Sequence, residues 1–175
     1  MLKNNFVKYT LMFILLVLLQ VTVLNSISFL GYAIPLVYIY FIIKLPIGLN
    51  RNIALVLGFF LGFIIDIFSN TPGMNAAATV FAAFICRPAQ NLFFTADDYN
   101  DQTPSLSSLG FSFIKYAVFI TLIHHIILIS IESFSYLNIE MILLRIVLST
   151  LLTTILIFAF EGFSLNKKKT WQKTT

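Results

Sequence analysis

The chain alternates long apolar runs with short polar segments over almost all of its 175 residues. Such runs are typical of membrane-spanning helices, which need about 20 predominantly apolar residues to cross the hydrocarbon of a bilayer. The pattern predicts one all-α transmembrane domain over residues 1–165 and a basic cytoplasmic tail over residues 166–175. The six expected spans cover residues 7–24, 31–43, 52–68, 73–85, 111–131 and 139–160.

Two of these runs, residues 31–43 and 73–85, are shorter than a regular span requires. Each can be a short, partly unwound or re-entrant helix that is buried among the other spans. Pro35 falls early in the first of them, where a helix tolerates proline in its first turn. Pro88 is expected to end the second.

The cationic side chains occur on every second connecting segment, which is the pattern that the positive-inside rule produces. The expected outer loops, residues 25–30, 69–72 and 132–138, contain no Lys or Arg. With four spans instead of six, the cations would fall on both sides without a pattern. The sequence therefore predicts a bundle of six transmembrane helices with both termini in the cytoplasm. The cations that follow the pattern are Lys3, Lys8, Lys44, Arg51, Arg87, Lys115, Lys167, Lys168, Lys169 and Lys173.

Composition narrows the class of protein further. The chain is 59% hydrophobic and 10% charged, a balance that a soluble domain of this length could not keep away from water. Its net charge of +4 does not indicate a nucleic-acid partner, because the basic residues lie in short segments that orient spans. The single cysteine, Cys86, excludes an internal disulfide and offers no metal-ligand spacing. No cofactor and no metal are expected.

Small residues and a carboxylate share one face of the third expected span. Gly58 and Gly62 form a GxxxG pattern, on which another helix can pack closely, and Asp66 follows four residues later near the same face. The next span is also rich in small residues. This surface either packs inside the bundle or binds the single span of a partner. Its candidate residues are Gly58, Gly62, Asp66, Asn75, Ala78 and Ala82.

Other ionisable residues also fall inside expected spans. His124 and His125 are adjacent and point about 100° apart on a helix, so they are not expected to share a metal. With Glu132 they are candidates for interhelical hydrogen bonds or for a proton-coupled role. Arg145 and Asp66 are expected at similar depths in the outer leaflet. We predict that they form an ion pair, the alternative being that Arg145 reaches the outer headgroups alone.

The sequence contains no nucleophile–base pair, P-loop, HExxH or dinucleotide fingerprint. No catalytic residue is therefore assigned, and the chain is not expected to be an enzyme.

Residues 58–84 resemble the characteristic motif of the MreD family of bacterial rod shape-determining membrane proteins. The stretch reads GFFLGFIIDIFSNTPGMNAAATVFAAF: a glycine-spaced helix ending in Asp, a short Ser/Pro/Gly turn, then Gly-x-Asn and a small-residue helix. The resemblance implies a multi-pass, non-enzymatic scaffold of the cell-elongation complex in the bacterial cytoplasmic (inner) membrane. It also implies binding to a bitopic partner of the MreC type, and an indirect link between an MreB-type filament and peptidoglycan synthases. The implied fold is similar to that of energy-coupling-factor transporter S components.

Two alternatives remain open. One is a substrate-binding subunit of a vitamin-type uptake transporter, which would hold its ligand in a pocket at the outer end. Its obvious polar candidates are few: Glu132, Tyr136 and Asn138. The other is a proton- or ion-coupled transporter that uses Asp66, His124 or Glu132, although no internal repeat of the kind common in such transporters is evident.

Overall fold

The computed structural model describes residues 2–26, 33–95, 103–134 and 138–173, and over these residues the chain is helical without a β-strand. Tyr136 and the acidic residues Asp97, Asp98 and Asp101 lie outside the described residues. The elements in chain order are α1 (Leu2–Thr22), η1 (Leu24–Ser26), η2 (Val37–Ile39), α2 (Tyr40–Ile43), α3 (Arg51–Ser69), α4 (Met74–Phe93), α5 (Leu106–Glu132) and α6 (Ile139–Lys173).

Three helical segments are long and apolar enough to cross a membrane: α3, α5 and residues Ile139–Gly162 of α6. The apolar part of α1, Val7–Thr22, is shorter. Large apolar side chains cover the outward faces of these helices, among them Ile67 on α3 and Ile155 on α6, which are 61% and 63% exposed. A surface this apolar is typical of a protein that is surrounded by lipid.

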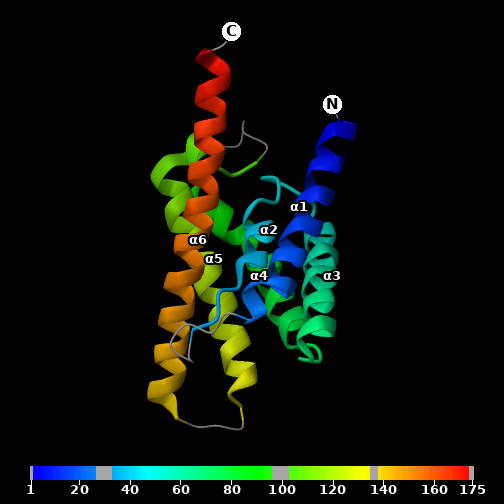
Figure 1. Cartoon of the computed structure of the whole chain (residues 1–175), viewed down its shortest axis with the longest axis vertical. Coiled ribbons are helices and arrows are strands. Elements are labelled where there is room, and N and C mark those ends of the chain that lie inside the picture. The colour runs from blue at the N-terminus through cyan, green and yellow to red at the C-terminus, as the bar shows by residue number, and fades with distance from the viewer. Residues whose placement is uncertain (1, 27–32, 96–102, 135–137, 174–175) are drawn as a thin grey trace.

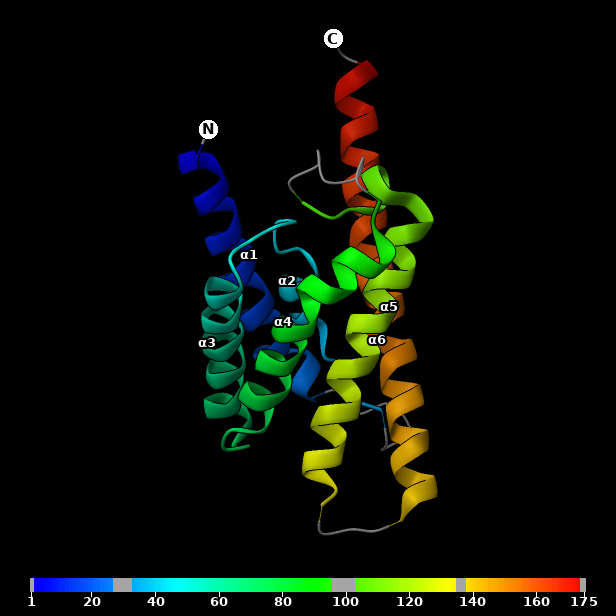
Figure 2. The same ribbon diagram turned by 180° about the vertical axis from the view of Figure 1, so that it is seen from behind.

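The helices pair as antiparallel hairpins (Figure 1). Helices α3 and α4 lie side by side, as do α5 and α6, and both pairings are visible again from behind (Figure 2). The start of α1 and the end of α6 lie at one end of the molecule. The α3–α4 turn, the end of α5 and the start of α6 lie toward the other end, which we call the turn end.

Local signals explain where α3 begins and ends. Asn50 caps its N-terminus, because the Asn50 side chain accepts a hydrogen bond from the backbone N–H of Asn52 at 2.9 Å. At its C-terminus Asn70 adopts the left-handed conformation, with φ 54°, which ends the helix. Gly73 has φ 81° at the N-cap of α4, a backbone conformation that glycine adopts without strain. This turn aligns α4 antiparallel to α3.

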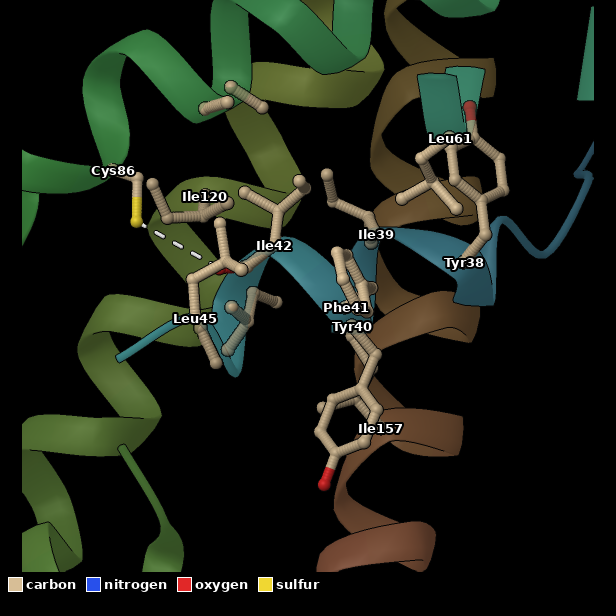
Figure 3. Close-up of a cluster of buried hydrophobic side chains, with 14 of the residues drawn as sticks. Tyr38, Ile39, Tyr40, Phe41, Ile42, Leu45, Leu61, Cys86, Ile120 and Ile157 are labelled. Atoms are coloured by element: carbon tan, nitrogen blue, oxygen red, sulfur yellow. Dashed lines mark hydrogen bonds between the residues drawn. The ribbon is translucent and has the colours of Figure 1, made fainter. Parts of the chain in front are cut away.

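The η2–α2 segment forms the centre of the core, and every residue from Val37 to Ile43 is buried. Figure 3 shows its side chains between α4 and α5 on one side and α6 on the other. Tyr38 and Tyr40 point in opposite directions along the bundle in this view. The second expected span is therefore helical over seven residues only, and residues 33–36 are not helical.

The expected end of the helix at residues 73–85 and the expected start of the helix at residues 111–131 are both wrong. Helix α4 continues through Pro88 to Phe93, although proline removes one backbone hydrogen bond from the helix. Buried side chains at Ala89 and Gln90 keep this last part of α4 packed against the core. Helix α5 starts at Leu106 and contains a non-helical kink at Gly110, with φ 50° and ψ −122°.

Candidate functional site

Side chains of α1 and α6 form hydrogen bonds with the backbone of the unwound segment 33–36. The backbone N–H of Ile34 donates to Ser149 Oγ at 3.2 Å, and that of Leu36 donates to Thr153 Oγ1 at 3.0 Å. Gln20 accepts from the N–H of Val37 and donates to the carbonyl of Pro35. Non-helical backbone at membrane depth is stable only when its polar groups are satisfied inside the protein. Polar residues of two other helices provide that here.

Asp66 is the cap of helix α4. Its carboxylate accepts hydrogen bonds from the backbone N–H groups of Asn75 at 2.9 Å and Ala76 at 2.8 Å. The Thr71 hydroxyl and the Asn75 side-chain amide each donate to it at 2.9 Å. Asp66 is buried, 4% exposed, and a negative charge at a helix N-terminus is favourable. The carboxylate therefore has a structural role at the start of α4.

The hydrogen bonds to Asp66 determine which atoms donate and which accept in a longer hydrogen-bond network. Because Asn75 donates its amide N–H groups to Asp66 and Thr71, its Oδ1 atom accepts the hydroxyl proton of Tyr38 at 2.7 Å. Tyr38 has only one such proton, so His124 Nε2 must donate to the Tyr38 oxygen at 3.0 Å. His124 Nδ1 is then an acceptor, and it is buried without a partner among the described residues.

His125 takes the opposite tautomer. Its Nδ1 atom lies 2.8 Å from the carbonyl oxygen of Thr121 and must donate to it, because a carbonyl can only accept. Its Nε2 atom accepts from Thr153 at 3.3 Å, whose hydroxyl oxygen is already the acceptor for Leu36. In this arrangement both histidines act as hydrogen-bonding groups, His124 toward Tyr38 and His125 toward Thr121 and Thr153.

A second buried polar cluster lies toward the opposite end of the bundle. Glu161 of α6 accepts from the Tyr40 hydroxyl at 2.5 Å and from Lys44 Nζ at 2.7 Å, and its other oxygen accepts from the N–H of Leu106 at 3.2 Å. Cys86 contacts Tyr116 Oη at 3.0 Å in the same half. Glu161 therefore joins the end of α2 and the start of α5 to α6.

The predicted ion pair between Asp66 and Arg145 is wrong. Arg145 pairs with Glu132 at 3.1 Å, and Asp66 is surrounded by four neutral donors of the α3–α4 turn. Depth along a helix sets the height of a side chain but not the direction in which it points. Glu132 is on the neighbouring antiparallel helix, and each partner of the pair keeps a quarter or more of its side-chain surface exposed.

The glycine stripe lies inside the bundle. A Cβ atom on Gly62 would fall 2.5 Å from backbone atoms of Asn75 and Ala76, and one on Gly58 would fall 3.0 Å from the Ala83 side chain. Ala78 and Ala82 of α4 are also fully buried. The two glycines therefore pack against α4, and they cannot form the outward docking surface that was one of the two expectations from the sequence.

The Glu132–Arg145 pair borders a cavity of about 370 Å³ at the turn end. The cavity lies between α3 and the segment 33–36 on one side and α5 and α6 on the other, and it is partly open to the surroundings. The residues that bring polar groups to its wall are Asn25, Ser69, Thr71, Asn75, His125, Glu132, Arg145 and Ser149. A pocket of this size with a few polar groups has the general form of a small-molecule site.

Sequence reasoning located the ionisable residues of this region but missed their partners. Gln20, Tyr38, Ser149 and Thr153 were not singled out, because single polar residues within apolar runs carry no periodic signal. An uncharged polar residue in an apolar span needs a partner, and that requirement alone could have marked Gln20. Within the described ranges, no three His, Cys, Asp or Glu side chains are grouped so that they could hold a metal ion.

No protein-family model, curated protein or solved structure matches this chain. Its function must therefore be inferred from its own residues and geometry.

Proposed function

We propose that this chain is a multi-pass, non-enzymatic scaffold of the bacterial inner membrane, of the MreD type. It would bind an MreC-type bitopic partner and thereby connect an MreB-type filament to peptidoglycan synthases during cell elongation. One observation carries the proposal: the residues that make the sequence resemble this family also form one physical unit. Gly62 allows α4 to approach α3, and Asp66 holds the N-terminus of α4 through Asn75 and Ala76.

The proposed topology has six crossings and cytoplasmic termini. Helices α1, α3, α4, α5 and α6 have 19 or more residues, and 19 residues span about 28 Å at 1.5 Å per residue. The remaining crossing is residues 33–43, whose four non-helical and seven helical residues can reach about 24 Å. Its satisfied backbone makes a partly unwound crossing physically acceptable.

The partner is expected on the lipid-facing side of the α3–α4 hairpin. Phe59 and Phe63 stack there, with ring centroids 5.6 Å apart, beside a shallow crevice that reaches Gly73 and Ala76. Both rings are more than two-fifths exposed. A stacked aromatic ridge beside a small-residue crevice suits a single packed helix.

Co-purification from native membranes tests the scaffold proposal. Full-length chain should retain an MreC-type partner, and Phe63→Ala should lower its recovery about threefold or more. Ile155→Ala removes an exposed apolar side chain from α6 instead and is the matched control, which should retain the partner. Failure of the wild-type chain to retain any such partner would contradict the scaffold role.

Reporter fusions test the topology separately. Alkaline phosphatase fused after Asn70 should be active, because that turn is expected to be periplasmic. A fusion after Thr103 should be inactive. The reverse result at either position would contradict six crossings with cytoplasmic termini.

The cavity supports a second candidate, a substrate-binding subunit of a small-molecule uptake transporter. Such a subunit needs a pocket at its outer end, and the 370 Å³ cavity lies at the turn end, which the proposed topology places outside. Accumulation of a small molecule in cells that depends on this chain would favour this candidate over the scaffold.

A further inference from the structure

We propose that the cavity at the turn end binds a zwitterionic amphiphile. Such a molecule carries adjoining ammonium and phosphate or carboxylate groups on an apolar body. The inference rests on the cavity and goes beyond the scaffold role, so binding and partner recovery can succeed or fail independently.

One part of the cavity wall is apolar and suits the body of an amphiphile. Ile34 and Leu36 come from the unwound segment, and Leu128 and Ile129 come from α5. A cavity of about 370 Å³ holds a headgroup and the first carbons of a chain, and its partly open form lets a longer chain extend outward. Burying such carbons is favourable, because it removes apolar surface from water.

Most neutral polar groups at the wall are already engaged. Asn75 uses both amide N–H groups and its carbonyl oxygen, and both ring nitrogens of His125 have partners. Ser149 accepts from Ile34 and keeps its hydroxyl proton for another acceptor. These groups shape the cavity but offer few new hydrogen bonds.

The Glu132–Arg145 pair still has hydrogen-bond donors and an acceptor that are free to bind another molecule. The two side chains share one contact, from Arg145 Nη2 to Glu132 Oε2 at 3.1 Å. Among the described residues, no other acceptor meets the guanidinium, which has five N–H donors, and no donor meets Glu132 Oε1. Arg145 can therefore hold an anionic group in bidentate geometry while Glu132 accepts from an ammonium.

Charge balance selects a zwitterion over an anion. The pair is neutral as a unit, and each side chain keeps only about a quarter of its surface exposed. An anionic ligand would bring an unmatched charge into this partly buried site, which is unfavourable. A zwitterion adds one charge of each sign, so that two opposite pairs lie antiparallel at the cavity mouth.

Two sources supply this chemistry, a bilayer lipid of the phosphatidylethanolamine class and a free, water-soluble amphiphile such as a short-chain lysophosphatidylethanolamine. Native mass spectrometry of the full-length chain should compare phosphatidylethanolamine with phosphatidylglycerol of identical acyl chains. If the source is lipid, the zwitterionic lipid should be retained about tenfold more strongly. If the source is a solute, the short-chain lysophosphatidylethanolamine should raise the melting temperature of the chain. Equal retention of the two lipids together with no thermal shift would overturn the inference.

Charge variants show whether the bound molecule lies in this cavity. Glu132→Gln leaves Arg145 unbalanced, so it should reverse the lipid preference toward phosphatidylglycerol, or weaken solute binding about tenfold. Glu140→Gln makes the same change at an exposed position near the start of α6 and should leave binding unaltered. If Glu132→Gln does not fold, Arg145→Lys keeps the charge, loses the forked donors and should lower retention about threefold. A wild-type binding pattern in the folded variant would overturn the assignment.

Discussion

The α3–α4 hairpin and the α5–α6 hairpin each contain a carboxylate near the turn end, but the two carboxylates differ in the number of their hydrogen-bond partners. In the first, Asp66 accepts four hydrogen bonds from Thr71, Asn75 and Ala76, and glycine lets the two helices approach closely. In the second, Glu132 meets one arginine at the edge of a cavity. We call α3–α4 the closed hairpin, because its carboxylate holds the start of α4. We call α5–α6 the open hairpin, because its carboxylate keeps hydrogen-bonding capacity for another molecule.

The largest expected effect is in the closed hairpin. Gly62→Ala puts a Cβ atom 2.5 Å from backbone atoms of α4, which must then move away, and we expect a loss of about 3 kcal/mol in the free energy of unfolding. Gly58→Ala meets its nearest neighbours at 3.0 Å and should cost less. Unfolding in detergent, followed by circular dichroism, measures both changes.

Gly162→Ala is the control for these glycine substitutions. Nothing lies within 4 Å of its added Cβ atom, so the higher helix propensity of alanine should stabilise α6 slightly. Equal stability losses at all three glycines would show that close helix approach does not distinguish the closed hairpin.

The next prediction compares the loss of stability when each of the two carboxylates is removed. Asp66→Ala leaves the buried N–H groups of Asn75 and Ala76 without their acceptor, at a cost of about 1 kcal/mol each. Glu132→Ala removes one partner of a partly exposed pair and should cost about 1 kcal/mol or less. Thermal unfolding of the two variants under one condition gives the order. A larger loss for Glu132→Ala would contradict the distinction between a structural and an available carboxylate.

The smallest effect is the coupling between charges. A double-mutant cycle of Glu132→Gln and Arg145→Gln should give an interaction energy of about 0.5–1 kcal/mol, because the two side chains are in contact. The cycle of Asp66→Asn and Arg145→Gln should be additive within about 0.5 kcal/mol. Coupling between Asp66 and Arg145 instead would restore the pairing that depth along the helices suggested.

The sequence by itself determined the helical class and the position of most apolar helices. Long, predominantly apolar runs indicated α3, α5 and the apolar part of α6, because hydropathy reports the surroundings of a segment directly. The same property misplaced the end of α4, which continues past Pro88 although its composition becomes polar there. Hydropathy indicates where lipid contact ends, and a helix need not end at that point.

Only the tertiary structure decided how residues 33–36 are stabilised and which charges meet. The donors and acceptors for the unwound backbone come from Gln20 on α1 and from Ser149 and Thr153 on α6, more than 100 residues away along the chain for the last two. Arg145 and Asp66 lie at similar counted depths, yet helix rotation and packing direct Arg145 to Glu132. The sequence indicates how deep a residue lies along its helix and which face of that helix is apolar. The rotation of one helix against another depends on packing in the whole bundle.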